Sequence, residues 1–257
     1  MNDVMEPRRR FLARAAAAAL ALVLAGCDRL SRTEWFPRVL AVAEKWNDAA
    51  AHAITPRKAM AQEFAESDRS PTFRSNGTAN PGTDDYRAMV ANGFADYRLA
   101  VAGMVGQPKS FSLVELLALP NRTQITRHDC VEGWSAIAKW KGVKLSAILD
   151  LVKPAAGARY VMFYCADPME EDGTDFYYES IDLDDAYHSQ TILAYEMNDA
   201  PLPVANGAPL RLRVERQLGY KHAKYVTAIA LVDTFGNVAG GKGGYWEDQG
   251  YQWYAGI

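Results

Sequence analysis

Cysteine is scarce in this chain of 257 residues, which contains Cys27, Cys130 and Cys165 and no others. So few cysteines exclude the disulfide framework of a small secreted scaffold. The sequence has no Cys-x-x-Cys-His motif, which excludes a c-type haem of its own. Its four histidines are scattered rather than spaced like the ligands of a zinc site. Redox or metal chemistry would therefore depend on isolated cysteines.

Excess positive charge is also absent, because 28 Lys and Arg face 31 Asp and Glu, giving a net charge of −3. Residues 1–26 contain four arginines and two acidic residues, so the remainder carries −5. A mildly acidic protein offers no electrostatic surface to nucleic acid or to an anionic membrane. Neither partner is expected.

Long hydrophobic runs are missing as well. The Ala/Leu-rich stretch Ala13–Gly26 is too short to span a bilayer comfortably. It follows RRRFL (residues 8–12), which resembles a twin-arginine export signal, and it ends in LAGC (residues 24–27), which resembles a lipobox. We expect residues 1–26 to be a signal peptide and Cys27 to be lipidated. An ordinary signal peptide or an uncleaved anchor is the alternative.

The expected product is a periplasmic lipoprotein. In enterobacteria, an Asp directly after the lipidated cysteine, as at Asp28, is associated with retention at the inner membrane. We therefore expect the mature protein to be anchored there through its lipid. Residues 27–70 should form a helical lead-in, since Trp35, Val39, Val42 and Trp46 recur at helical spacing and Thr55-Pro56 is typical of a helix start. Residues 71–257 should form the catalytic domain.

The stretch Thr126–Trp140 holds the most informative cysteine. Residues 123–126 favour a strand, and residues 143–152 have the apolar spacing of a helix. Cys130 should therefore lie where a strand ends, in a tight loop just before a helix. A thiolate held in this way is open to a metal, although a lone cysteine is equally often a small buried apolar residue.

Other segments have clear local signals. Residues 97–105 alternate like a strand, and Ser112–Leu119 should be a helix with a capping box formed by Ser112 and Glu115. Further strands are expected at 159–165, 192–197, 210–214 and 225–232. The aromatic, Gly-rich segment 240–254 shows no readable chemistry; it could cap the domain or meet a partner.

Two separated motifs carry a resemblance to a known family. CVEGWS (residues 130–135), with Trp140 following, matches the first, and LAYEMNDAPLPVANGAPLRLRV (193–214) with GYKHAKYV (219–226) matches the second. They resemble the sulfite-oxidase superfamily of molybdenum enzymes, in particular the bacterial branch that includes the catalytic subunit of periplasmic methionine-sulfoxide reductases. The resemblance runs from about Phe73 to about Asp233. It implies an α+β fold with mixed sheets and short helices around a buried molybdopterin.

The resemblance also assigns site residues. Cys130 would be the catalytic protein ligand of molybdenum, which one molybdopterin dithiolene also holds. The other implied cofactor contacts are Asn76, Cys165, Asn206, Arg211, His222, Ala223 and Lys224. Three of them leave alternatives open. Asn76 could be a plain Asn-Gly turn, and Arg211 could lie with Arg213 on a solvated strand face. Cys165, which stands where related reductases have a threonine, could simply pack.

The implied reaction is two-electron oxygen-atom transfer. Sulfite-oxidising relatives follow the cysteine with Gly-Asn-Arg-Arg, whereas here VEGW (residues 131–134) places an acid and an aromatic there. We therefore expect reduction of a neutral S-oxide, although Arg127, Arg213 or Lys139 could still fold over the site. With no haem or flavin motif, electrons should come from a haem-bearing membrane subunit or a soluble cytochrome. The alternatives are a sulfite-oxidising enzyme, or a metal-free exported binding module with a Cys130–Cys165 disulfide.

Overall fold

The computed structural model describes residues 33–36, 38–40, 42, 43, 46, 58–170 and 172–257. The chain divides into two units, Met1–Pro56 and Arg57–Ile257. In the first unit, the described residues between 35 and 46 are helical, as expected. The predicted signal peptide, the predicted lipidation of Cys27 and the predicted helix start at Thr55-Pro56 lie outside the described residues. Among the helices that are described, none has the length and apolar character to cross a membrane.

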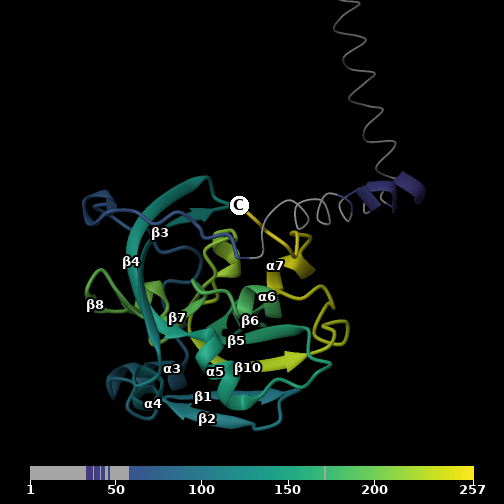
Figure 1. The fold of residues 1–257 in the computed structure, drawn as a ribbon. Helices are drawn as coiled ribbons and strands as arrows, with labels where there is room; N and C mark the ends of the chain where they lie inside the picture. The colour runs from purple at the N-terminus through teal and green to yellow at the C-terminus, as the bar shows by residue number, and fades with distance from the viewer. Residues whose placement is uncertain (1–32, 37, 41, 44–45, 47–57, 171) are drawn as a thin grey trace, which may run out of the picture. The chain divides into compact units, whose positions relative to one another are not determined.

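The second unit contains two five-stranded sheets (Figure 1). The first has the order β2-β1-β10-β5-β6, and only its β1–β10 pair is parallel. The second has the order β3-β4-β7-β8, with β9 also paired to β7. The first sheet is built from Arg98–Gly103 (β1), Lys109–Ser112 (β2), Tyr160–Pro168 (β5), Phe176–Asp182 (β6) and Val226–Val232 (β10). The second is built from Asn121–Cys130 (β3), Trp134–Lys144 (β4), Ile192–Met197 (β7), Ala200–Pro201 (β8) and Arg211–Arg213 (β9).

The helices in this unit are short. Ser112 caps α4 as predicted: its hydroxyl accepts from the Glu115 N–H at 3.2 Å, and the Glu115 carboxylate accepts from the Ser112 N–H at 2.8 Å. Mixed sheets with short helices confirm the predicted α+β fold class. The α-helices are Asp84–Ala91 (α3), Leu113–Leu117 (α4), Leu145–Val152 (α5), Leu183–Ala186 (α6) and Tyr245–Asp248 (α7), and the 3-10 turns are Glu66–Asp68 (η1), Val204–Asn206 (η2) and Gly219–Lys221 (η3).

The main apolar core joins both sheets to α5. Its members include Ile148 from α5, Phe163 and Ile229 from the first sheet, and Leu193 and Leu212 from the second, all essentially inaccessible to solvent. The predicted strand at 192–197 is confirmed with the same ends, and those at 97–105, 159–165, 210–214 and 225–232 are confirmed with shifted ends. Burying apolar residues from both sheets in one core fixes the β3–β4 hairpin relative to β9 and β10, the elements on either side of the site.

Two expectations about local structure were wrong. Cys130 ends β3 as predicted, but the loop after it leads into β4 rather than directly into a helix. The reason is visible in alternate burial along β4, where Ala136, Ala138 and Trp140 point inward at a period of two. The helix predicted at 143–152 is confirmed as α5, which begins at Leu145. The helical lead-in predicted to reach residue 70 also fails at its end. Residues 58–65 run without helix beside β3, and the Phe64 N–H donates to the Ile125 carbonyl at 2.9 Å.

Candidate active site

The β3–β4 hairpin determines where the Cys130 thiol points. Gln124, Thr126 and His128 are buried on one face of β3, and Cys130 follows in the same alternation. The three-residue turn Val131–Gly133 reverses the chain so that Cys130 pairs with Trp134. Gly133 adopts φ +84°, which favours glycine, and its N–H donates to the Cys130 carbonyl at 3.0 Å. The sequence of this turn therefore aims a half-buried thiol inward.

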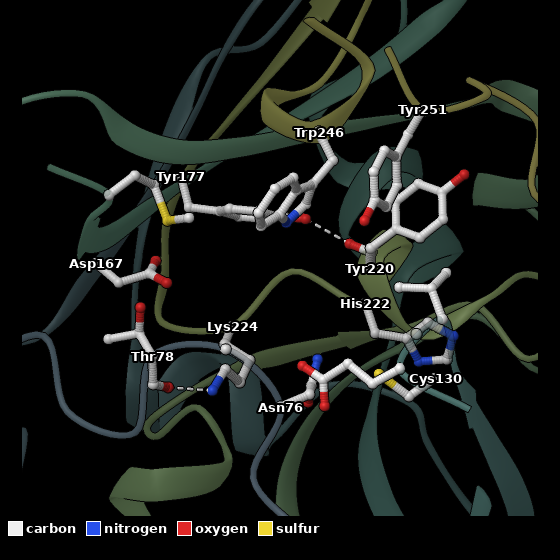
Figure 2. A pocket seen from close by; sticks show the side chains of 15 residues that line it. Asn76, Thr78, Cys130, Asp167, Tyr177, Tyr220, His222, Lys224, Trp246 and Tyr251 are labelled. Atoms are coloured by element: carbon white, nitrogen blue, oxygen red, sulfur yellow. Dashed lines mark hydrogen bonds between the residues drawn. The ribbon is translucent and has the colours of Figure 1, made fainter. Parts of the chain in front are cut away.

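A cavity of ≈170 Å³ opens in front of this thiol (Figure 2). Burial raises the pKa of Cys130, while the backbone N–H groups of Glu132 and Val131 and the charge of Arg211 act in the opposite direction. A bound metal cation would favour the thiolate strongly. The cavity is lined by Asn76, Gly77, Thr78, Cys130, Val131, Glu132, Asp167, Met169, Tyr177, Gly219, Tyr220, His222, Lys224, Trp246 and Tyr251.

Two arginines of β9 are buried, and one of them, Arg211, contacts Asn76 in the cavity lining. Arg211 and Arg213 share one face of β9, as their alternation predicted, but both are fully buried, so the alternative of a solvated face is wrong. Their guanidinium groups stack on Trp140, at 5.4 and 4.4 Å from its ring centroid. Arg213 is neutralised by Glu215 through an Nε–Oε1 contact of 2.9 Å, whereas Arg211 donates to the Asn76 side chain at 3.1 Å and to the Asn206 carbonyl at 3.3 Å. Burial and Arg213 lower the pKa of Arg211 to about 9.

Several buried polar atoms near the arginines lack a hydrogen-bond partner in the described part of the chain. They include Asn206 Nδ2, Arg211 Nε, His128 Nε2 and His222 Nδ1. Arg213 donates to His128 Nδ1 at 3.0 Å, so the neutral His128 ring carries its proton on the unpartnered Nε2. Leaving such groups unsatisfied costs about 1–3 kcal/mol each. A ligand rich in acceptor atoms, as a phosphorylated pterin is, would satisfy the donors among them, and the residues fit that group.

Lys224 fastens the loop that carries Asn76. Its Nζ donates to the Thr78 carbonyl, to the Ser75 hydroxyl at 3.4 Å and to the Ala205 carbonyl at 3.3 Å. Burial and the charge of Arg211 lower the pKa of Lys224 to about 7, and burial raises the pKa of nearby Asp167 to about 6. A phosphate at this point would restore the full charge of the lysine.

The predicted site residues fall into three groups. Asn76, Cys130, His222 and Lys224 line the cavity, and Asn206 and Arg211 are buried behind Asn76. Cys165 and Ala223 belong to the apolar core and do not line it. Cys130 and Cys165 are both free thiols, so the disulfide of the binding-module alternative is not formed. For Cys165, packing is the role that this environment favours, and its contact with a pterin remains a prediction.

The cavity has a single amine. Arg127 pairs with Asp129 at 2.9 Å, and Lys139 contacts Glu66 at 2.6 Å and Asp199 at 2.8 Å; neither lines the cavity, and nor does buried Arg213. Among the residues that do line it, Lys224 is the only lysine or arginine, against two carboxylates. Glu132 is exposed at the mouth and accepts a hydrogen bond of 2.8 Å from the Trp134 indole.

Most aromatic residues of the cavity wall were not predicted from the sequence. Tyr177, Tyr220, Trp246 and Tyr251 gather on one side of the cavity in Figure 2, and two of them come from the tail whose role was left open. The high aromatic content of that tail was the available signal. His128 was dismissed as scattered, although its position two residues before Cys130 in a strand places both on one face.

The comparisons with known proteins identify the class. A family model described as the oxidoreductase molybdopterin binding domain matches residues 87–237, more than half of the chain. The chain therefore belongs to the family of oxidoreductases with a molybdopterin-binding domain, as predicted. This confirms that the protein is an oxidoreductase and that its cofactor is molybdenum–molybdopterin.

The chain is also similar to several individual proteins. A candidate protein-methionine-sulfoxide reductase subunit, YedZ1 of Azospira oryzae, is 37% identical over 97% of this chain and 87% of its own length. The protein-methionine-sulfoxide reductase catalytic subunit MsrP of Xanthomonas axonopodis pv. citri is 36% identical over 59% of this chain, and the match spans about half (49%) of that relative. MsrP of Ralstonia nicotianae is 30% identical over 90% of this chain and 70% of its own length. The sulfane dehydrogenase SoxCD from Paracoccus pantotrophus is a structural neighbour, with a TM-score of 0.49, 22% identity and coverage of 55% and 39% of the two chains.

Proposed function

We propose that this protein reduces a neutral S-oxide by two-electron oxygen-atom transfer, with electrons supplied by a separate redox protein. The observation that carries the proposal is the make-up of the cavity at Cys130. It contains one amine, a carboxylate at its mouth and an aromatic wall. A sulfite dianion would need a cluster of cations there, whereas a neutral, polarisable sulfoxide does not.

In this proposal Cys130 is the protein ligand of molybdenum. The thiol lies at the cavity surface and is half-buried, which leaves it accessible to a metal. The described part of the chain contains no cluster of three or more His, Cys, Asp or Glu side chains suited to a metal ion, so the thiol would act as the single protein ligand. The cofactor supplies the oxygen-atom transfer when it is bound.

The polar groups around the cavity would hold the pterin. Asn206 and Arg211 have unpartnered donor atoms, and Asn76 is oriented by Arg211. Lys224 is the cation best placed for the terminal phosphate, because a dianion would compensate its burial. His222 would contact the pterin from the cavity wall, Ala223 would do so through its backbone, and Cys165 is the weakest of the proposed contacts.

The deciding experiment compares two reactions of protein purified after native export and shown to contain molybdenum. One assay follows reduction of methionine sulfoxide by a reduced dye, and the other follows sulfite-dependent reduction of cytochrome c or ferricyanide. We expect sulfoxide turnover with little or no sulfite oxidation. Robust sulfite oxidation without sulfoxide turnover would replace the proposal with the sulfite-oxidising alternative.

A substitution at Glu132 tests whether the cavity prefers neutral over anionic substrates. Replacing Glu132 with Gln removes the charge at the mouth and keeps the shape, so an anionic substrate or inhibitor should bind more tightly while neutral sulfoxides are little affected. Inhibition by sulfate, measured in wild type and in Glu132→Gln, tests this without dependence on the natural substrate. Equal inhibition of both would remove Glu132 from the substrate argument.

Location and electron supply belong to the same proposal. The RRRFL motif supports export in the folded state, and the LAGC motif supports a lipid on Cys27. Together they would place the enzyme at the periplasmic face of the inner membrane. There it would receive electrons from a haem-bearing membrane subunit or a soluble cytochrome. Cys27→Ala should move the protein from the membrane fraction to the soluble fraction. Arg8→Lys with Arg9→Lys should leave precursor in the cytoplasm. Unchanged fractionation of either variant would contradict this part.

A further inference from the structure

The last twenty residues of the chain reach the cavity although they lie outside the matched family domain. The family model ends at residue 237, whereas Trp246 and Tyr251 line the cavity. This tail runs from Val238 to Ile257 and contains α7. Its contribution to the site therefore needs its own explanation.

The two tail aromatics form a continuous apolar wall. The rings of Trp246 and Tyr251 are stacked, with centroids 5.3 Å apart and planes inclined by 29°. Tyr220 meets the Tyr251 ring edge-on at 5.2 Å, and the Tyr177 side chain continues the wall in Figure 2. Met169 also lines the cavity. Tyr251 remains 41% exposed and Trp246 is only partly buried, so both rings keep free surface for another molecule. Aromatic faces favour apolar and sulfur-containing groups.

A buried ion cluster fastens the wall to the domain. The Lys221 ammonium donates to Glu247 of α7 and to Glu179 of β6, at 2.5 Å each, and all three side chains are inaccessible to solvent. A side chain at Gly244 would collide with both carboxylates, so a larger residue there would have to displace them. Glu247 directly follows Trp246 in α7. The ion cluster therefore holds this helix in place, and the helix positions the Trp246 ring.

Hydrogen bonds also hold the segments before and after α7. The Asp248 carboxylate accepts from the N–H groups of Gly240 at 2.8 Å and Lys242 at 3.0 Å, and from the Tyr178 hydroxyl. Further along, the Leu218 N–H donates to the Ala255 carbonyl at 2.9 Å. The tail is thus a built part of the domain, and the cavity receives a rigid wall from it.

We propose that the tail, residues 238–257, is the specificity element of the site, and that the Trp246–Tyr251 stack binds an apolar substituent on the sulfur of the substrate. This inference rests on the proposed reduction of S-oxides. The oxygen of such a substrate must face the position of the cofactor at Cys130, and its carbon substituents then point away from that position. The wall opposite is apolar and aromatic, so the enzyme favours sulfoxides with a large apolar arm over small ones.

The test compares two sulfoxides of different size in the holoenzyme. In Trp246→Ala the KM for methyl phenyl sulfoxide should rise about tenfold, and the KM for dimethyl sulfoxide by less than about twofold, with kcat unchanged for both. Tyr251→Ala, which truncates a more exposed ring, should give the same pattern with a smaller rise. Trp253→Phe is the matched control: Trp253 is in the tail, but its indole donates to Ser180 at 2.8 Å and does not line the cavity, so neither KM should change.

Binding of the product thioether separates this inference from the proposed function. The Kd of methyl phenyl sulfide, measured calorimetrically, should rise about tenfold in Trp246→Ala, whether or not the enzyme turns over. Unchanged Kd and KM in both wall variants, or equal losses for the two sulfoxides, would disprove the wall and leave S-oxide reduction intact. A wild-type enzyme that binds the sulfide through Trp246 but reduces no sulfoxide would instead disprove the proposed function.

Discussion

Two buried charged clusters lie close to the cavity, and they differ in what they lack. The first, here called the donor cluster, contains Arg211, Asn206 and His128, each with a hydrogen-bond donor that has no partner among the described residues. The second, the closed cluster, contains Lys221, Glu179 and Glu247, and its unpartnered atoms are the Oε2 oxygens of the two carboxylates. An unpartnered N–H donor needs an acceptor from outside the cluster, whereas a buried carboxylate can take up a proton, which removes its charge.

The difference separates binding from support. Burial raises the pKa of Glu179 well above its usual range, against the opposing charge of Lys221, which favours a protonated carboxyl and a neutral closed cluster. The donor cluster has no comparable internal solution, because its unpartnered atoms are all N–H groups and cannot accept hydrogen bonds from one another. Buried charge alone therefore does not mark a ligand site. A ligand site is marked by buried N–H donors that lack an acceptor.

The largest loss of activity should come from removing the Cys130 thiol, which lines the cavity. Cys130→Ser should lower sulfoxide turnover by at least roughly a thousandfold, because a serine hydroxyl does not replace a thiolate as a molybdenum ligand. Circular dichroism should show an intact fold. Cys165→Ser is the control, and its turnover should stay close to wild type because Cys165 lies in the core. Equal losses in both variants would show that the role of Cys165 has been misjudged.

The next effect should appear in the closed cluster and only in stability. Lys221→Met leaves two buried carboxylates without a cation, which should lower the free energy of unfolding by about 3–5 kcal/mol. Glu179→Gln imitates the protonated carboxyl and should cost about 1 kcal/mol. Urea unfolding at pH 7.5 gives both values. Similar values for the two variants would mean that the cluster is not neutralised by a proton on Glu179.

A smaller effect should appear in the donor cluster and in cofactor content. Arg211→Ala removes charge-assisted hydrogen bonds worth about 1.5–3 kcal/mol and frees Asn76, so the fraction of protein carrying molybdenum and pterin should fall. Metal analysis and fluorescence of the oxidised pterin measure the occupancy. Arg127→Ala removes an exposed arginine on the opposite face of β3 and should keep full occupancy. Full occupancy with altered substrate preference in Arg211→Ala would place Arg211 in substrate binding.

The smallest effect concerns Asp167, a cavity carboxyl near the donor cluster. Its pKa is raised from 3.8 to about 6, so the folded cofactor-free protein binds more protons than the unfolded chain between these values. The associated stability is present below pH 4 and is lost as pH rises through 6. Asp167→Asn should thus stabilise the cofactor-free protein by about 1–2 kcal/mol at pH 8, with a smaller gain at pH 5. Urea unfolding at both pH values measures it, and a gain independent of pH would refute the stated cause.

A control for that measurement lies in the turn that follows β5. Asp172 is exposed, and hydrogen bonds from Thr174 lower its pKa. Asp172→Asn should therefore give no gain at high pH. If it stabilised the protein as much as Asp167→Asn, general charge reduction rather than burial would explain both results.

The sequence by itself determined the family, the cofactor and the strand that ends in Cys130. These conclusions rest on contiguous motifs and on local periodicity, which survive without knowledge of distant contacts. The capping box at Ser112 and the alternation of Arg211 and Arg213 belong to the same category. What local pattern could not supply was the direction of burial: the same alternation fits a solvated face or a face stacked on Trp140.

Only the tertiary structure decided which residues meet. In the structure the tail lines the same cavity as Cys130, Cys165 lies in the apolar core, and the loop after Cys130 forms a hairpin turn. The lysine of the closed cluster lies 26 residues from Glu247 and 42 from Glu179, separations at which no periodic signal links them. Contacts of this range depend on how the two sheets pack around one core, and the sequence encodes that packing only through all of its residues together.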